Sequence, residues 1–202
     1  MKTFNTIYEI VRNSVENFSS RIAFSMLGGE DVSYKEVGER IEQVQELLLN
    51  AGVGAGDKVA ILSSSMPNWG VSYFAVTTAG MIAVPILPDF TSSELDLIIE
   101  HSEAKAILVS DKLYTKLNKS TVERMNIVIR TKNLSVISQT VHEQGSKAVP
   151  KPEDLAAIIY TSGTTSKPKG VMLTALNISS NIDFALNNIP VTDTDKIMSM
   201  LP

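Results

Sequence analysis

Residues 56–88 read GDKVAILSSSMPNWGVSYFAVTTAGMIAVPILP, and this stretch decides the fold of the chain. The runs KVAIL at 58–62 and IAVPIL at 82–87 are short and apolar, which is typical of strands buried on both faces. Between them, residues 67–78 predict a helix that is entered through two serines and has Pro67 in its first turn. A strand, a helix and a second strand in this order predict a parallel pair covered by the helix.

The alternation of strands and helices continues on both sides of this unit. Apolar runs predict strands at 106–109, 127–129, 155–160, 171–173 and 196–201, with a short extended pair around 22–27. Apolar positions at helical spacing predict helices that begin near residues 7, 34, 92, 111 and 175. Three helix starts carry a capping box, in which a Ser or Thr precedes a Glu by three residues: Thr6 and Glu9, Ser33 and Glu36, Thr91 and Glu94. The sequence therefore predicts an α/β fold with a mainly parallel sheet flanked by helices.

Residues 133–152 interrupt this rhythm. They are polar, contain Gly145, Pro150 and Pro152, and are interpreted as a connection rather than an element. At the other end, the apolar run KIMSML at 196–201 has no partner strand after it, whereas domain boundaries normally fall in polar linkers. We therefore expect residues 1–202 to be one part of a larger domain.

Composition excludes several classes of protein. The 202 residues are 44% hydrophobic and 20% charged, which are ordinary values for a globular protein of one or two domains. A net charge of −4 argues against nucleic-acid binding, and the lack of cysteine excludes a disulfide framework or a thiolate metal site in these residues. No apolar run approaches the roughly 20 residues of a membrane span, and the charged amphipathic start is not a signal peptide. We therefore expect a cytoplasmic location.

The segment YTSGTTSKPKG at 160–170 is dense in hydroxyl groups, glycine and lysine. Backbone N–H groups in such a loop can converge on an anion, hydroxyls can bind phosphate oxygens or Mg²⁺, and lysine adds positive charge. The segment does not fit the Walker A pattern, because Lys169 precedes Gly170 and no Ser or Thr follows. From composition alone, a solvated hairpin turn is the better explanation, because polar turns are common and nucleotide loops are rare.

A family resemblance decides between these two interpretations. The stretch YTSGTTSKPKGVMLT resembles YTSGTTGxPKGVxxTH, the signature of AMP-forming acyl-CoA synthetases, peptide-synthetase adenylation domains and luciferases. Residues 56–88 are similar to the first core strands and helix of that superfamily, and MSMLP at 198–202 looks like the start of its next motif. The resemblance covers most of residues 33–202, and the MPNW and AVPILP runs look most like long-chain fatty acid–CoA ligases.

The resemblance implies a two-step ligase reaction. A carboxylate attacks the α-phosphate of Mg²⁺-ATP to give an acyl-adenylate and pyrophosphate, and a thiol, usually coenzyme A, then takes the acyl group. Carried over by position, the ATP phosphate contacts are Thr161, Ser162, Gly163, Thr164, Thr165 and Lys169, and Thr161 is also the candidate Mg²⁺ ligand. Ser166 and Ala175 depart from the family pattern, which usually has glycine and often histidine there.

Most of the family's remaining active site lies beyond the position that matches Pro202. This applies to its adenine and ribose contacts, its Mg²⁺-binding glutamate and its C-terminal catalytic lysine. We therefore expect no catalytic residue within these 202 residues, weak nucleotide binding and no turnover by this chain alone. Two other functions stay open: an aryl- or amino-acid-adenylating enzyme of the same superfamily, and a non-catalytic nucleotide-binding or scaffold domain.

The remaining candidate residues favour structural interpretations. His101 and His142, the only histidines, have no cluster of ligands around them and are interpreted as solvated. Trp69, Tyr73 and Phe74 lie on one predicted helix and are interpreted as core. A locally basic stretch would suit peripheral contact with an anionic membrane, but it is more typical of a solvated face: Lys112, Lys116, Lys119, Arg124, Arg130 and Lys132. The sequence does not indicate an oligomeric state.

Overall fold

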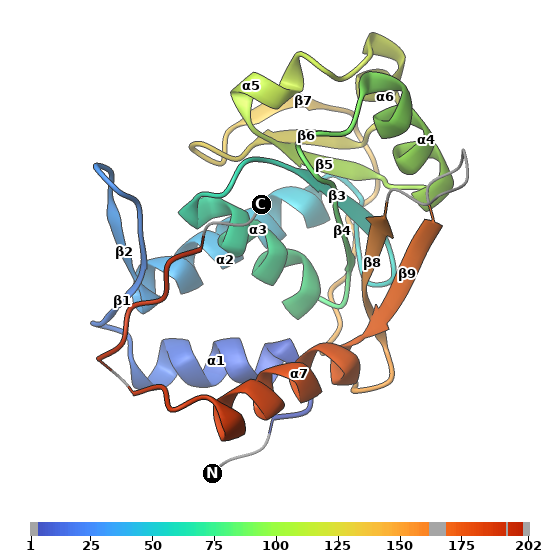
Figure 1. Ribbon diagram of the computed structural model, residues 1–202. Helices are drawn as coiled ribbons and strands as arrows, with labels where there is room; N and C mark the ends of the chain where they lie inside the picture. The colour runs from blue at the N-terminus through green and yellow to red at the C-terminus, as the bar shows by residue number, and fades with distance from the viewer. Residues whose placement is uncertain (1–3, 162–168, 193, 200–202) are drawn as a thin grey trace.

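A computed structural model describes residues 4–161, 169–192 and 194–199. In these residues the main sheet has the strand order β7-β6-β5-β3-β4-β8-β9. Neighbouring strands from β6 to β8 are parallel, and the two edge strands are antiparallel to their neighbours. The strands are β3 (Lys58–Leu62), β4 (Ile82–Pro85), β5 (Ala106–Val109), β6 (Ile127–Arg130), β7 (Val136–Gln139), β8 (Leu155–Thr161) and β9 (Lys169–Thr174). The predicted α/β fold with a mainly parallel sheet is confirmed (Figure 1).

Helices cover both faces of this sheet. One face packs against α2 (Tyr34–Asn50) and α3 (Pro67–Thr78), with α1 (Ile7–Asn17) packed on these two helices, and the other against α4 (Ser92–Ser102), α5 (Asp111–Tyr114) and α6 (Lys119–Arg124). Because successive side chains of a strand alternate between faces, Ile61 of β3 belongs to the first core and Leu62 to the second. Both side chains are fully buried, which explains why KVAIL is a continuous apolar run.

The three predicted capping boxes are present, and a fourth begins α7 (Ala175–Asn188). In this fourth box, the backbone N–H of Asn177 donates to the Thr174 hydroxyl over 3.2 Å, and the Asn177 side chain accepts from the Thr174 N–H. Helix α3 differs from the prediction, because its N-cap is Met66 rather than a serine and has no side-chain cap. A small antiparallel hairpin of β1 (Ile22–Ser25) and β2 (Asp31–Ser33) packs against α2 and α3 and lies apart from the main sheet (Figure 1).

The interpretation of residues 133–152 as a plain connection is wrong in part. They contain β7, which pairs antiparallel with β6 and forms one edge of the sheet. Strand β7 was missed because apolar and polar residues mix in its sequence, so it lacks the continuous apolar run of a buried strand. It is an edge strand, with only one of its edges paired and its side chains largely exposed.

After β7 the chain forms a strap, residues 140–148, along the amino ends of the parallel strands. Its backbone is tied to the end of α2 and to the turns that precede β3 and β4: Gly145 N–H donates to Leu49 O (2.8 Å), Ala55 N–H to Ser146 O (2.7 Å) and Ala148 N–H to Ala79 O (3.0 Å). A Cβ added at Gly145 would lie 2.6 Å from the carbonyl oxygen of Val53. Glycine is therefore required where the strap crosses the turn before β3.

Three further expectations need correction. The helix expected over 111–117 ends at Tyr114, and beyond it Lys116 donates from Nζ to the carbonyl oxygens of Pro88 (2.6 Å) and Phe90 (3.1 Å). Helix α6 was not expected. Residues 196–199 of the expected last strand form no strand, and Ile197 is 85% exposed, since no described strand pairs with this segment.

The predicted aromatic cluster packs on the core but is only half-buried. The rings of Trp69 and Tyr73 stack with centroids 5.5 Å apart, and Phe74 stacks on Phe24 of β1 at 6.4 Å. In the described part of the chain, no helix combines the length and the apolar character needed to cross a membrane.

Candidate phosphate-binding hairpin

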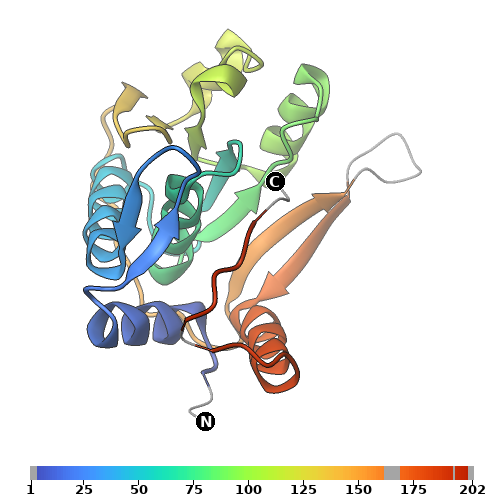
Figure 2. The ribbon, with the colours of Figure 1, turned by 60° about the vertical axis from the view of Figure 1, so that its left-hand side comes forward.

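The candidate site lies where strands β8 and β9 form a hairpin at the edge of the sheet. The two strands pair antiparallel, with Tyr160 opposite Gly170 and Thr161 opposite Lys169. Figure 2 shows the hairpin extending away from the layers of helices. This register brings the two ends of the segment 162–168 side by side. The candidate phosphate contacts Ser162, Gly163, Thr164 and Thr165, and the atypical Ser166, lie outside the described residues.

Two of the predicted phosphate contacts, Thr161 and Lys169, are described, and both are exposed. No described residue engages the Thr161 hydroxyl or the Lys169 ammonium in a hydrogen bond or ion pair. These groups are therefore accessible to an anionic ligand at the ends of the two strands. The hydroxyl can donate to a phosphate oxygen or contribute one oxygen to Mg²⁺, and the ammonium can supply positive charge.

Gly170 has a structural role that composition did not reveal. A Cβ at this position would lie 2.9 Å from Cγ2 of Ile158 and 3.2 Å from Cζ of Tyr160. The missing side chain lets the Tyr160 ring lie across β9. The glycine of the PKG triplet thus serves the packing of the hairpin stem, independently of any ligand.

Tyr160 connects the hairpin to helix α4. Its side chain is only 2% exposed and packs in the core between the sheet and α4. Its hydroxyl shares a hydrogen bond of 2.7 Å with Nδ1 of His101, and the two rings meet edge to face with centroids 5.8 Å apart. Burial raises the pKa of Tyr160, so the phenol stays protonated at neutral pH and can donate this bond.

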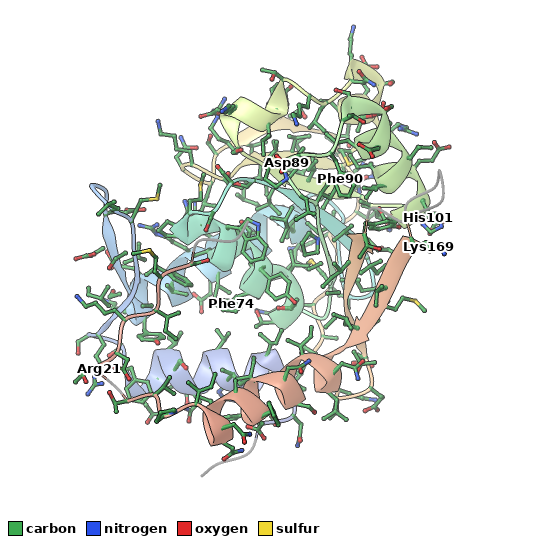
Figure 3. The ribbon with its side chains drawn as sticks, in the orientation of Figure 1. Arg21, Phe74, Asp89, Phe90, His101 and Lys169 are labelled. Carbon is green, nitrogen blue, oxygen red and sulfur yellow. The ribbon has the colours of Figure 1, made fainter. Side chains whose placement is uncertain are left out.

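The interpretation of His101 as a solvated side chain is incomplete. The residue is exposed, but its Nδ1 also shares a hydrogen bond with the buried Tyr160. His101 lies in the last turn of α4, and Figure 3 labels His101 together with Lys169 of β9. The sequence offered one signal for this contact, which was a histidine at the end of a predicted helix. It did not show which strand that helix packs against. His142 is exposed and has only a local bond to Thr140.

The described residues contain no group of three or more His, Cys, Asp or Glu side chains that could hold a metal ion. Thr161 therefore fits Mg²⁺ only as a single oxygen ligand. This is compatible with the chemistry of Mg²⁺, which keeps several waters and is commonly bound through substrate phosphates and one or two protein groups.

This mostly parallel α/β sheet flanked by helices is shared with the N-terminal domains of adenylate-forming enzymes. Residues 11–202 match the AMP-binding enzyme family, and the chain belongs to that family.

The relatives and solved structures agree with this assignment. The chain is 32% identical over 173 residues to Zwittermicin A synthase ZmaJ of Bacillus cereus, covering 86% of this chain and 32% of that one. It is 27% identical to fatty acyl-CoA synthetase A of Dictyostelium discoideum, with 100% and 34% coverage.

Among solved structures, O-succinylbenzoate coenzyme A synthetase (MenE) from Bacillus subtilis, in complex with AMP, superimposes with a TM-score of 0.74 at 25% identity. This superposition covers 94% of this chain and 48% of that one. The chain thus spans about a third of the length of these two curated relatives.

Proposed function

We propose that this chain supplies the phosphate-binding hairpin of an ATP-dependent ligase that activates a carboxylic acid as an acyl-adenylate. One observation carries the proposal: the β8–β9 register places Thr161 and Lys169 opposite each other, both exposed, at the two ends of a Ser-, Thr- and Gly-rich segment. Family membership supplies the chemistry to which this geometry belongs.

In this proposal the hairpin binds the β- and γ-phosphates of ATP, which leave together as pyrophosphate. Lys169 places its ammonium beside the phosphate charge, and Thr161 donates its hydroxyl or serves as one ligand of Mg²⁺. Ser162, Gly163, Thr164 and Thr165 add hydroxyl and backbone donors. Prepositioned donors of this kind stabilise the charge that develops on the leaving group. Bound Mg²⁺ would supply additional charge neutralisation at the phosphates.

The proposed acid substrate is a long-chain fatty acid, and the proposed acceptor is coenzyme A. The MPNW and AVPILP runs support this choice, as does the relative named fatty acyl-CoA synthetase A. A cytoplasmic location is part of the same proposal. The similarity to Zwittermicin A synthase ZmaJ favours the second candidate, an enzyme of the family that adenylates a different acid.

We further propose that residues 1–202 alone do not catalyse the reaction. The described residues provide phosphate contacts at one hairpin, and the chain spans less than half of the relatives that it matches. A ligand held only by its phosphates forgoes most of the contact area of a nucleotide pocket. An ATP–pyrophosphate exchange assay on this chain should therefore show no turnover above background. Substantial exchange would refute this part of the proposal.

Phosphate binding itself is tested by titrating the chain with Mg²⁺-pyrophosphate and Mg²⁺-ATP and following backbone amides by NMR. We expect a dissociation constant on the order of 1 mM, with the largest shifts among the amides of residues 161–169. Lys169→Ala should weaken binding roughly three- to tenfold, because an exposed charge-assisted contact is lost. The matched control is Lys147→Ala, because Lys147 is also an exposed lysine but lies on the strap and not on the hairpin. Equal affinities of the Lys169→Ala variant and the parent would contradict the assigned role.

A further inference from the structure

The backbone ladder that joins the hairpin to the rest of the sheet is short. Strand β8 pairs with β4 only at Ala157, which lies opposite Ala83, although β8 continues to Thr161. Beyond Ala157 the stem of the hairpin, residues 158–161 and 169–172, is paired internally by the β8–β9 ladder. Something other than the β4–β8 ladder must therefore fix the stem relative to the domain.

Pro85 explains why the ladder stops. Ile86 N–H donates to Ile61 O of β3 over 2.9 Å, so the backbone groups of Ile86 face β3. Because these groups alternate along a strand, those of Ala83 and Pro85 face β8. Ala83 is the residue that pairs with β8, and Pro85 has no N–H to donate at the next position. The ladder thus ends one step after it begins.

Beyond Ala157, side-chain contacts rather than β4–β8 backbone hydrogen bonds join the stem to the domain. Tyr160 is the stem residue whose side chain is buried in the core between the sheet and α4, whereas the next residue in each direction, Ile159 and Thr161, is exposed. The tyrosine ring could slide along an apolar surface, because apolar contact is not directional. Its hydrogen bond to Nδ1 of His101 has a defined distance and direction, and it comes from a helix anchored by Leu95, Ile98 and Ile99.

We propose that His101 is a positioning residue for the phosphate-binding hairpin: through Tyr160 it fixes the stem that carries Thr161 and Lys169. The inference rests on the proposed function of the hairpin for its consequence in ligand binding, but not for its effect on the stem. His101 does not contact the phosphates in this scheme. Its effect on Thr161 is indirect, because it is hydrogen-bonded to Tyr160, the residue that precedes Thr161.

The test uses substitutions that separate the hydrogen bond from the bulk of the side chain. His101→Leu removes the partner of the tyrosine hydroxyl, and Tyr160→Phe removes the hydroxyl while keeping the buried ring. His101→Asn places an amide group where Nδ1 stood and should restore the bond. His142→Leu is the matched control, because His142 is exposed and bonds only to Thr140.

Hydrogen exchange of the stem amides is measured first, without ligand. We expect exchange at 158–161 and 169–172 to accelerate about three- to tenfold in His101→Leu and Tyr160→Phe, the range expected for one net hydrogen bond. Exchange should return toward the parent rate in His101→Asn and stay unchanged in His142→Leu. The double variant His101→Leu with Tyr160→Phe should exchange no faster than either single variant, because both remove the same bond.

Affinity for Mg²⁺-pyrophosphate is measured on the same proteins. A parallel loss in His101→Leu and Tyr160→Phe, with recovery in His101→Asn, supports the positioning role. Unchanged stem exchange in His101→Leu overturns it, as does an opened stem with parent-like affinity. If the parent binds no pyrophosphate, the proposed function fails, and the exchange rates alone decide whether His101 fixes the stem.

Discussion

The side-chain amide of Asn68 donates a hydrogen bond of 2.8 Å to the backbone carbonyl of Thr131. Asn68 lies in the first turn of α3, and Thr131 follows β6, so the bond joins two elements that are far apart in the sequence. The side-chain oxygen Oδ1 of Asn68 accepts from Arg40 of α2 over 2.9 Å, and Arg40 also pairs with Glu30. The side chain of Asn68 is buried, which makes this small network costly to leave incomplete.

Replacing Asn68 should therefore destabilise the domain. Asn68→Ala removes the donor to Thr131 and leaves Arg40 with one acceptor fewer, and we expect a loss of about 1–3 kcal/mol in the free energy of unfolding. Urea denaturation measures this loss. Asn181→Ala, at an exposed position of α7, is the control and should stay within about 0.5 kcal/mol of the parent. Equal stability of the two variants would show that the network contributes nothing.

The strap predicts a strict requirement for glycine. In Gly145→Ala the added Cβ would run into the backbone of Val53. The atoms that it would meet all belong to the main chain, so they cannot rotate away as the end of a side chain could. We expect a loss of roughly 1–3 kcal/mol, as for other overpacked sites. Lys147→Ala is the control on the same strap. Thermal unfolding of both variants decides the matter, and a Gly145→Ala variant as stable as the parent would contradict the close approach.

The capping boxes predict a measurable loss at helix starts. Thr91→Ala removes the hydroxyl that accepts from the Glu94 N–H, so the first turn of α4 loses one cap and stability should fall by about 1 kcal/mol. Ser92→Ala, one residue later and without a capping bond, should leave stability nearly unchanged. Chemical denaturation compares the two. A larger loss in Ser92→Ala than in Thr91→Ala would be incompatible with the assigned cap.

Tyr73 predicts an alkaline limit to stability. Burial raises the pKa of Tyr73 to about 12, whereas an unfolded tyrosine titrates near 10. Below pH 10 both states hold the proton. Between pH 10 and 12 only the folded state holds it, so this side chain should cost up to ~1.4 kcal/mol of stability per pH unit.

The variant Tyr73→Phe isolates this contribution. Its free energy of unfolding should fall less steeply than that of the parent between pH 10 and 12, and a spectrophotometric titration of the parent should show a late-titrating phenol. Parallel stability curves for the two proteins would mean that Tyr73 titrates normally.

Much of the fold could be predicted from the sequence because its signals are local. Buried parallel strands such as KVAIL are continuous apolar runs, and a capping box needs only the two residues that form it. Strand β7 and helix α6 were not predicted, since β7 is an exposed edge and α6 is a single short element with only Thr121 buried.

The site could be predicted only in part for a related reason. The resemblance assigned Thr161 and Lys169, and the structure places them opposite each other. The bond between His101 and Tyr160 joins residues 59 positions apart, and no local pattern encodes that distance. Pro85 can be seen in the sequence, but its effect on the β4–β8 ladder depends on whether its backbone faces β3 or β8, which the sequence does not show.

The strap also bears on the order in which the chain folds. Its contacts join Gly145 to Val53 and Ala148 to Gly80, residues separated by roughly 90 and 70 positions, and closing loops of that length is entropically costly. Strands β3 to β6 pair through shorter connections and can assemble before the strap arrives. Contacts made after the rate-limiting step affect unfolding rather than folding. Gly145→Ala should accordingly accelerate unfolding and leave the refolding rate almost unchanged, so the strap acts as a kinetic latch on a sheet that is already formed.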